Sequence, residues 1–241
     1  RRKLKCGSQW IKLLTSRRAD CPEFSQEELD AAADECHRLH HKIAVHSGVP
    51  STIQMCIDAG FDTIEHGTFL SEDQARQMRE KGLAWVPTIT PYVRGYRRMQ
   101  AICDREGDGA SQDVRSACAH YKRAAEAYQQ NFKTLCGIIG RVGAGTDLSI
   151  DEGEGAPVAE ELEFMTAFGL EPLEAIRIGT SGGAEILDLQ EVTGSIRPGL
   201  SADLLVVRGD PSRDIGALKS IRRVYYKGKT VFNLEGKDAA K

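Results

Sequence analysis

The sequence predicts an α/β fold with a parallel sheet, and three observations support this prediction. Short apolar runs alternate with segments of helical periodicity, which is the pattern of successive βα units. The expected strand ends near His46, His66 and Thr88 follow one another at intervals of about twenty residues, as in a (β/α) barrel. No G-x-G-x-x-G segment follows an early strand, so a doubly wound nucleotide-binding sheet is the less favoured alternative.

The expected strands are short runs rich in apolar and β-branched residues. They cover residues 10–15, 42–46, 62–67, 83–90 and 140–147. Between them, Ser25 with Glu28 and Ser71 with Gln74 have the spacing of capping boxes, which predicts two helix starts. Gly82 is the expected end of the second of these helices.

The later part of the chain predicts two further features. Residues 91–139 are too long for a simple βα connection and read as a polar, helical, lid-like insertion with a break near 107–109. From residue 191 the chain has turn-punctuated strands, which predict a small antiparallel β domain. The expected organisation is therefore a domain over 1–190 and a small β domain over 191–241.

Composition limits the function classes. The formal net charge is −3, so the basic surface typical of nucleic-acid binding is not expected. No apolar run approaches the roughly 18 residues that span a bilayer. The seven cysteines are odd in number and form no Cys-x-x-Cys pair, which favours a reducing compartment. We therefore expect a cytoplasmic protein that acts on a small molecule, with neither a nucleic acid nor a membrane as partner.

Polar, titratable side chains end several of the expected strands. His46, His66 and Asp147 occupy such positions, and Lys12 lies one strand earlier. Strand ends converge at the mouth of a barrel, and two neutral imidazoles with a carboxylate suit a divalent ion such as zinc. The alternative is that these histidines are hydrogen-bonded structural residues. Glu65 is expected on the opposite side of its strand from His66, toward the helical layer or a salt bridge.

Five segments carry a resemblance to a known family. They are WIKLLTS, KIAVHSGVPSTIQMCIDAGFDTIEHGTFL, GLAWVPTIT, GAGTDLS and GSIRPGLSADLLVV. Together they resemble the amidohydrolase superfamily, and within it the imidazolonepropionase-related, Xaa-Pro dipeptidase-like enzymes. The resemblance covers nearly the whole chain. It implies strands four to eight of a partial (β/α)8 TIM-type barrel, followed by part of a small β-sandwich domain.

The resemblance also implies roles for individual residues. Lys12 matches a carboxylated lysine that bridges two metal ions, and His46 and His66 match ligands of the second ion. Asp147 matches an aspartate that binds the first ion and takes the proton from the attacking water. Tyr92 matches a tyrosine near the substrate carbonyl. The implied activity is hydrolysis of a C–N bond in a dipeptide, an N-acyl amino acid or a cyclic amide, with one or two divalent ions, zinc being favoured.

The chain departs from the family pattern at several points. No His-x-His pair occurs, and the chain begins with Arg1 in what resembles strand four of eight. We therefore expect either a piece of a longer enzyme or a truncated, inactive homologue, with self-association through open sheet edges as a possible homo-oligomer. A mononuclear deaminase of the same superfamily is a third reading. Arg17 and Arg18 stand where the family often has glycines; Arg17 is expected to bind a substrate carboxylate, or else to lie in a solvated loop.

Overall fold

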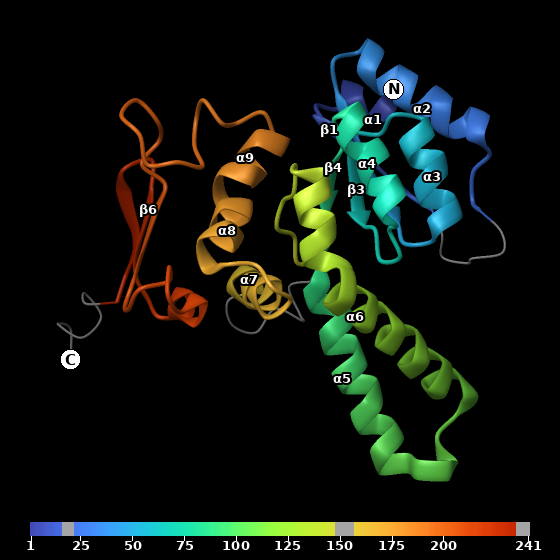
Figure 1. Ribbon diagram of the computed structural model, residues 1–241. Coiled ribbons are helices and arrows are strands. Elements are labelled where there is room, and N and C mark those ends of the chain that lie inside the picture. The colour runs from blue at the N-terminus through green and yellow to red at the C-terminus, as the bar shows by residue number, and fades with distance from the viewer. Residues whose placement is uncertain (16–21, 148–156, 235–241) are drawn as a thin grey trace. The chain divides into compact units, whose positions relative to one another are not determined.

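The computed structural model describes residues 1–15, 22–147 and 157–234 (Figure 1). The chain divides into two compact units, Arg1–Val142 and Gly143–Lys241, and each is considered by itself. The expected β domain from residue 191 falls inside the second unit, and its boundary stays a prediction.

A parallel sheet forms the centre of the first unit, which confirms the predicted α/β class. Its strands are β1 (Trp10–Leu14), β2 (Lys42–Ser47), β3 (Thr63–His66) and β4 (Ala84–Val86), in the order β1-β2-β3-β4. Val142 adds one isolated parallel bridge to Trp85. A strand is expected over 140–147, and within the described residues this region forms only that single bridge. A partial barrel built on this sheet stays a prediction.

Helices alternate with the strands along the chain. They are α1 (Arg2–Lys5), α2 (Gln26–Arg38), α3 (Pro50–Asp58) and α4 (Glu72–Lys81). Both predicted capping boxes are present, at Ser25 with Glu28 and at Ser71 with Gln74, so side-chain oxygens satisfy N–H groups that the first helical turn leaves unpaired. Gly82 ends α4 with a left-handed backbone (φ 73°), as its lack of a Cβ allows.

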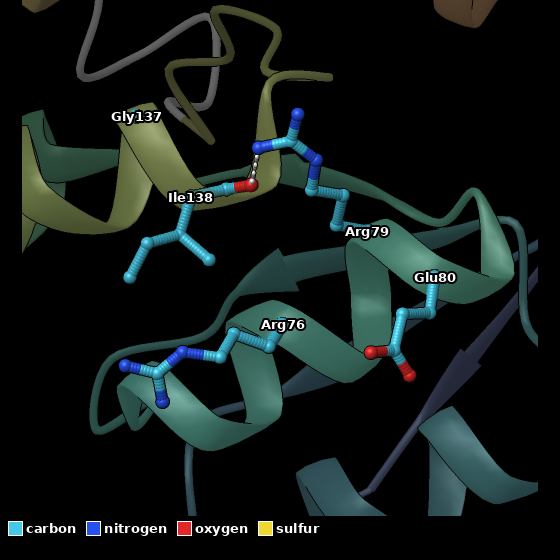
Figure 2. Close-up of a pocket in the computed structure, with 5 residues that line it drawn as sticks. All are labelled: Arg76, Arg79, Glu80, Gly137 and Ile138. Atoms are coloured by element: carbon cyan, nitrogen blue, oxygen red, sulfur yellow. Dashed lines mark hydrogen bonds between the residues drawn. The ribbon is translucent and has the colours of Figure 1, made fainter.

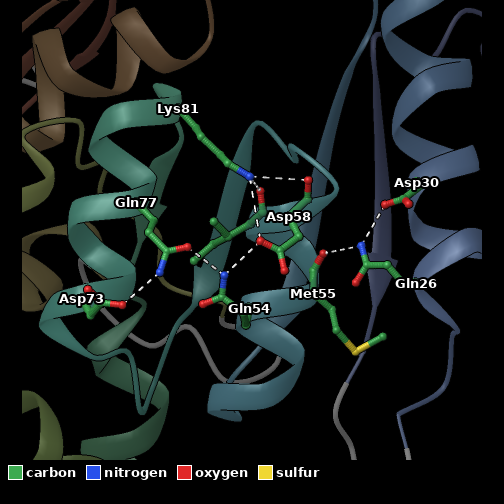
Figure 3. A network of polar contacts seen from close by, with 9 residues as sticks. Gln26, Asp30, Gln54, Met55, Asp58, Asp73, Gln77 and Lys81 are labelled. Atoms are coloured by element: carbon green, nitrogen blue, oxygen red, sulfur yellow. Dashed lines mark hydrogen bonds and ion pairs between the residues drawn. The ribbon is translucent and has the colours of Figure 1, made fainter.

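One face of the sheet is covered by these helices. Ile43, Val45 and Ile64 are fully buried, and Ser47 on the same face hydrogen bonds to Thr52 of α3 through the two hydroxyl oxygens, 2.8 Å apart. Polar contacts also link α2, α3 and α4 to one another (Figure 3). They run from Gln26 to Asp30 and the Met55 carbonyl, from Gln54 to Asp58 and Gln77, from Gln77 to Asp73, and from Lys81 to the carbonyl of Ile57. The helical layer is therefore fixed by both apolar and polar contacts.

A long helical hairpin follows β4, where the sequence predicts a helical insertion. It consists of α5 (Ile89–Glu106), a 3-10 turn (Gly107–Gly109) and α6 (Gln112–Ile139), and it extends away from the sheet (Figure 1). Strand β4 is shorter than predicted, because Thr88 adopts a left-handed backbone (φ 51°) and α5 begins at the next residue. The expected role as a lid stays a prediction.

The second unit combines helices with a small sheet. Its helices are α7 (Pro157–Ala167), α8 (Pro172–Arg177), a π-helical turn (Ile178–Gly182), α9 (Gly183–Ile186) and a 3-10 turn (Ile215–Lys219). Strands β5 (Leu204–Val207), β6 (Ile221–Tyr226) and β7 (Lys229–Asn233) pair antiparallel in the order β5-β6-β7. In the part of the chain that is described, no helix has the length and apolar character needed to cross a membrane.

Candidate functional site

Two histidine rings meet at the carboxyl ends of β2 and β3. The ring centroids of His46 and His66 are 4.3 Å apart, with the planes inclined by 67°. Strand alternation alone would place His66 with its pairing partner Ser47, on the helix-covered face. The left-handed backbone of His66 (φ 68°) interrupts this alternation, and its ring lies against His46 instead. The two imidazoles are therefore brought together by a local backbone reversal.

The same reversal corrects the expectation for Glu65. Glu65 pairs with His46 across β2 and β3, and its carboxylate accepts a hydrogen bond from the hydroxyl of Thr63 at 2.6 Å. Residues paired in this way share one face of a sheet. Glu65 therefore lies on the face of His46 rather than toward the helical layer, and the sequence expectation was wrong because it assumed regular alternation through His66.

Each histidine is anchored through its backbone carbonyl. The His46 carbonyl accepts hydrogen bonds from the backbone N–H and the hydroxyl of Thr15, at 3.0 and 3.1 Å. The His66 carbonyl accepts from the indole N–H of Trp85 at 2.7 Å and from the hydroxyl of Tyr128 at 2.9 Å. The backbone carbonyl of each histidine thus accepts two hydrogen bonds. These bonds limit how far the backbone at each histidine can rotate.

The ring of His66 is buried and paired with Thr88. Nδ1 of His66 lies 2.6 Å from Oγ1 of Thr88, and the two residues are 2% and 3% exposed. Burial lowers the pKa of His66 to about 3, with further lowering from His46 and from the positive charge of Lys12. His66 is therefore neutral at physiological pH, which is the form of imidazole that binds a metal ion.

Lys12 and Tyr92 also belong to the first unit. Lys12 is exposed on β1 and pairs with Ala44, two residues before His46, so both side chains project from one face of the sheet. The ring of Tyr92, in the first turns of α5, lies 5.9 Å from that of His66 between centroids. The structure thus brings both predicted residues close to the histidine pair.

The two remaining predicted site residues lie outside the described part of the first unit. Asp147 belongs to the second unit, is exposed and has a left-handed backbone (φ 46°). Arg17 lies outside the described residues. The roles predicted for both residues stay predictions.

The side chains near the histidine pair are of the kinds that bind a divalent ion, but they are few. Within residues 1–15, 22–147 and 157–234 there is no group of three His, Cys, Asp or Glu side chains placed to hold a metal ion. The first unit offers two imidazoles, one of them held neutral by burial, and a lysine on the same sheet face. Imidazole nitrogens are common ligands of zinc, so these residues fit a metal site that needs further ligands to be complete.

Surface hollows lie elsewhere in the molecule. In the first unit a hollow of about 610 Å³ lies between α4 and the end of α6 (Figure 2). Its lining residues are Arg76, Arg79, Glu80, Gly137 and Ile138, and the guanidinium of Arg79 donates to the carbonyl of Ile138 at 3.2 Å. In the second unit an apolar hollow of about 320 Å³ is lined by residues including Leu162, Ile176 and Ile221. Neither hollow includes a predicted site residue.

Sequence reasoning missed three side chains that hold His66. Thr88 and Trp85 both fall in the strand expected over 83–90, and Tyr128 falls in the helical insertion expected over 91–139. No motif marks them, because their partners are 19 to 62 residues away in the chain. At the same strand ends, the buried hydroxyl of Thr68 has no hydrogen-bond partner within the described part of the chain.

Known proteins match this chain over most of its length. A model of the amidohydrolase family matches residues 5–231. The ochratoxinase of Aspergillus niger is 28% identical, with 95% of this chain and 47% of that protein covered. An uncharacterized protein of Mycobacterium tuberculosis is 30% identical, with 93% and 58% covered. The chain thus spans about half the length of the curated relatives it matches.

A solved structure agrees with these sequence matches. The crystal structure of a Xaa-Pro dipeptidase with bound methionine in the active site superposes with a TM-score of 0.81 at 26% identity. The superposition covers 95% of this chain and 55% of that one. The fold described above is therefore similar to part of a larger enzyme.

Proposed function

Because the chain belongs to the amidohydrolase family, we propose that it carries part of a metal-dependent site for hydrolysis of a C–N bond of amide or peptide type. The observation that carries this proposal is the pair of imidazoles, with ring centroids 4.3 Å apart, at the carboxyl ends of adjacent parallel strands. The similarity to a Xaa-Pro dipeptidase with bound methionine in its active site supports a small substrate. We take this substrate to be a dipeptide, an N-acyl amino acid or a cyclic amide.

Four residues would hold one or two divalent ions, with zinc favoured. His46 and His66 would supply imidazole nitrogens, Lys12 in carboxylated form would supply an oxygen ligand, and Asp147 of the second unit would supply a carboxylate. When bound, such an ion supplies Lewis-acid chemistry that acidifies water and polarises a carbonyl group. The neutral state of His66 is compatible with this role, since a protonated imidazole cannot bind a cation.

The chain's own residues then move the proton and hold the substrate. An oxygen of water adds to the carbonyl carbon while an oxygen of the Asp147 carboxylate accepts the proton that this water releases. The C–N bond breaks, and Asp147 delivers the proton to the leaving nitrogen, so that the amine departs neutral. The Tyr92 hydroxyl donates a hydrogen bond to the carbonyl oxygen, and Arg17 pairs with a substrate carboxylate.

Metal content tests the site directly. The purified chain is loaded with zinc, passed through gel filtration and analysed for bound metal, together with His46→Ala and His66→Ala. We expect stoichiometric zinc in the unchanged protein and a clear loss in both variants. His40→Asn is the matched control, because His40 is exposed and its left-handed backbone (φ 57°) tolerates asparagine. Equal metal content in all four proteins would refute the site.

Hydrolysis tests the reaction. Release of free amine from a panel of dipeptides, N-acyl amino acids and cyclic amides is measured with and without Asp147→Asn. Turnover that disappears in this variant and after chelator dialysis supports the assignment. Metal binding without any turnover would instead support the alternative of a catalytically inactive homologue, which is also favoured by the small donor set of the described residues.

A further inference from the structure

We propose that Thr88 and Tyr128 are positioning residues of the candidate metal site. Thr88 orients the imidazole of His66 so that Nε2 is directed to the ion, and Tyr128 holds together the two backbone segments that carry this pair. The inference rests on the proposed function, because His66, the residue that Thr88 and Tyr128 contact, is one of the proposed metal ligands.

The contact between His66 and Thr88 selects one ring nitrogen. Nδ1 of His66 and Oγ1 of Thr88 are 2.6 Å apart, and neither residue is more than 3% exposed. A neutral imidazole carries its proton on one nitrogen and a lone pair on the other. When Nδ1–H donates to the threonine hydroxyl, the lone pair is on Nε2, which becomes the ligand atom. Thr88 thus occupies Nδ1 and fixes the direction of the ring, which leaves Nε2 as the nitrogen available to an ion.

The backbone at both partners is held in a disfavoured conformation. His66 and Thr88 have φ values of 68° and 51°, in the left-handed region that residues with a Cβ seldom adopt. Threonine is β-branched, so this backbone is especially unusual for Thr88. Such conformations persist where surrounding contacts over-determine them, and they gather at functional sites. The two strained positions are the ones whose side chains form the pair.

Tyr128 supplies the contact that joins these two segments. Its hydroxyl oxygen lies 2.9 Å from the carbonyl oxygen of His66 and 2.6 Å from that of Pro87, whose peptide bond leads into Thr88. The single phenolic proton is therefore shared between the two carbonyls. The indole N–H of Trp85 adds a second donor to the His66 carbonyl at 2.7 Å. Tyr128 is 2% exposed, so water has little access to replace its hydroxyl.

The helical hairpin has a second role, because Tyr128 belongs to it. Tyr128 lies in α6, 62 residues beyond His66 in the chain. Its ring also lies 5.6 Å from that of Tyr92, between centroids. The hairpin expected to act as a lid thus also supports the strand ends at which the proposed ligand sits.

The first test reads the ring of His66 in the metal-free protein. Long-range proton–nitrogen NMR spectra of 15N-histidine-labelled protein, with His66 assigned by its loss in His66→Asn, report which ring nitrogen is protonated. We expect the Nδ1–H form in the unchanged protein and in Thr88→Ser, which keeps the hydroxyl. Thr88→Val should shift the ring toward the Nε2–H form. An Nε2–H ring in the unchanged protein, or identical spectra for Thr88→Val, would overturn the inference.

The second test measures zinc affinity by competition with a chromophoric chelator. Loss of an outer-shell partner weakens metal binding by about 10- to 100-fold, so we expect this loss for Thr88→Val and Tyr128→Phe. Thr88→Ser should restore affinity, and Tyr96→Phe, a half-buried tyrosine of α5, is the control that should change nothing. Zinc binding by all variants with the affinity of the unchanged protein would overturn the inference while leaving the metal site intact.

The two tests separate failure of the inference from failure of the proposed function. If the unchanged protein binds no zinc, the proposed function fails, and the ring spectra still decide whether Thr88 sets the protonated nitrogen. A far-UV circular dichroism spectrum identifies any variant that does not fold. If Thr88→Val does not fold, the zinc affinities of Thr88→Ser and Tyr128→Phe test the inference instead.

Discussion

Substitution of Gly67 by alanine should destabilise the first unit more than an ordinary change in a turn. Gly67 follows His66 and has a φ of 58°, which is left-handed. A Cβ at this position would lie 2.7 Å from Nε1 and 3.2 Å from Cδ1 of Trp85. Trp85 has no exposed surface and donates its indole N–H to the His66 carbonyl, so the ring has little freedom to withdraw.

The size of the effect follows from these contacts. A left-handed backbone costs a residue with a Cβ about 1–2 kcal/mol relative to glycine. Overpacking against a buried side chain costs about 1–3 kcal/mol. Displacing the indole weakens a hydrogen bond with a net value of about 1 kcal/mol. Gly67→Ala should therefore lower the free energy of unfolding by about 3–6 kcal/mol.

Gly60→Ala provides the matched control. Gly60 is also left-handed (φ 75°), but a Cβ there would meet no atom within 4 Å. Its substitution should cost only the backbone contribution of about 1–2 kcal/mol. Urea unfolding followed by tryptophan fluorescence measures both, because Trp10 and Trp85 lie in the first unit. A cost for Gly67→Ala no greater than that for Gly60→Ala would refute the reasoning.

Two further predictions concern contacts of the same unit. Phe132→Ala should cost about 3–5 kcal/mol by urea unfolding, because Phe132 is fully buried with its ring 5.6 Å from that of Trp85, between centroids. Asp62→Ala should cost about 1–3 kcal/mol and His37→Ala under about 1 kcal/mol. The Asp62 carboxylate not only pairs with exposed His37 at 2.9 Å but also accepts the N–H of Ile43 at 2.8 Å.

Each of these predictions has an outcome that contradicts it. A cost under about 1 kcal/mol for Phe132→Ala would mean that α6 contributes little to the core beside β4. Equal costs at positions 37 and 62 would mean that the backbone N–H of Ile43 does not depend on the carboxylate. Both comparisons use the same unfolding measurement, with far-UV circular dichroism as a second probe of two-state behaviour.

Local signals in the sequence were sufficient for the helices. The Ser71 and Gln74 capping box and the Gly82 stop predicted α4 correctly, since each device acts within one helical turn. Strand β4 was predicted too long, because the apolar pattern from Leu83 to Thr90 continues through a reversal at Thr88. A left-handed threonine carries no sequence signal, since its conformation depends on tertiary contacts.

The candidate site was predictable only in part. The positions of His46 and His66 at strand ends follow from strand periodicity, and their rings do meet. The side predicted for Glu65 was wrong, because the left-handed backbone of His66 turns the His66 ring to the face that Glu65 and His46 share. Tyr128 could not be found from the sequence, because one tyrosine in a 28-residue helix gives no sign of which carbonyl it will reach.

The helical hairpin packs against the rest of the first unit near one end, through the start of α5 and the later part of α6. Helix α5 is buried only near its start, at Ile89, Thr90 and Val93, whereas its 18 residues extend it by about 27 Å. The far end of the hairpin, at Gly107–Gly109, has no buried residue. Changes near Gly107–Gly109 should therefore leave the histidines undisturbed, whereas a change of one methyl group near Tyr128 is transmitted directly to the ends of β3 and β4.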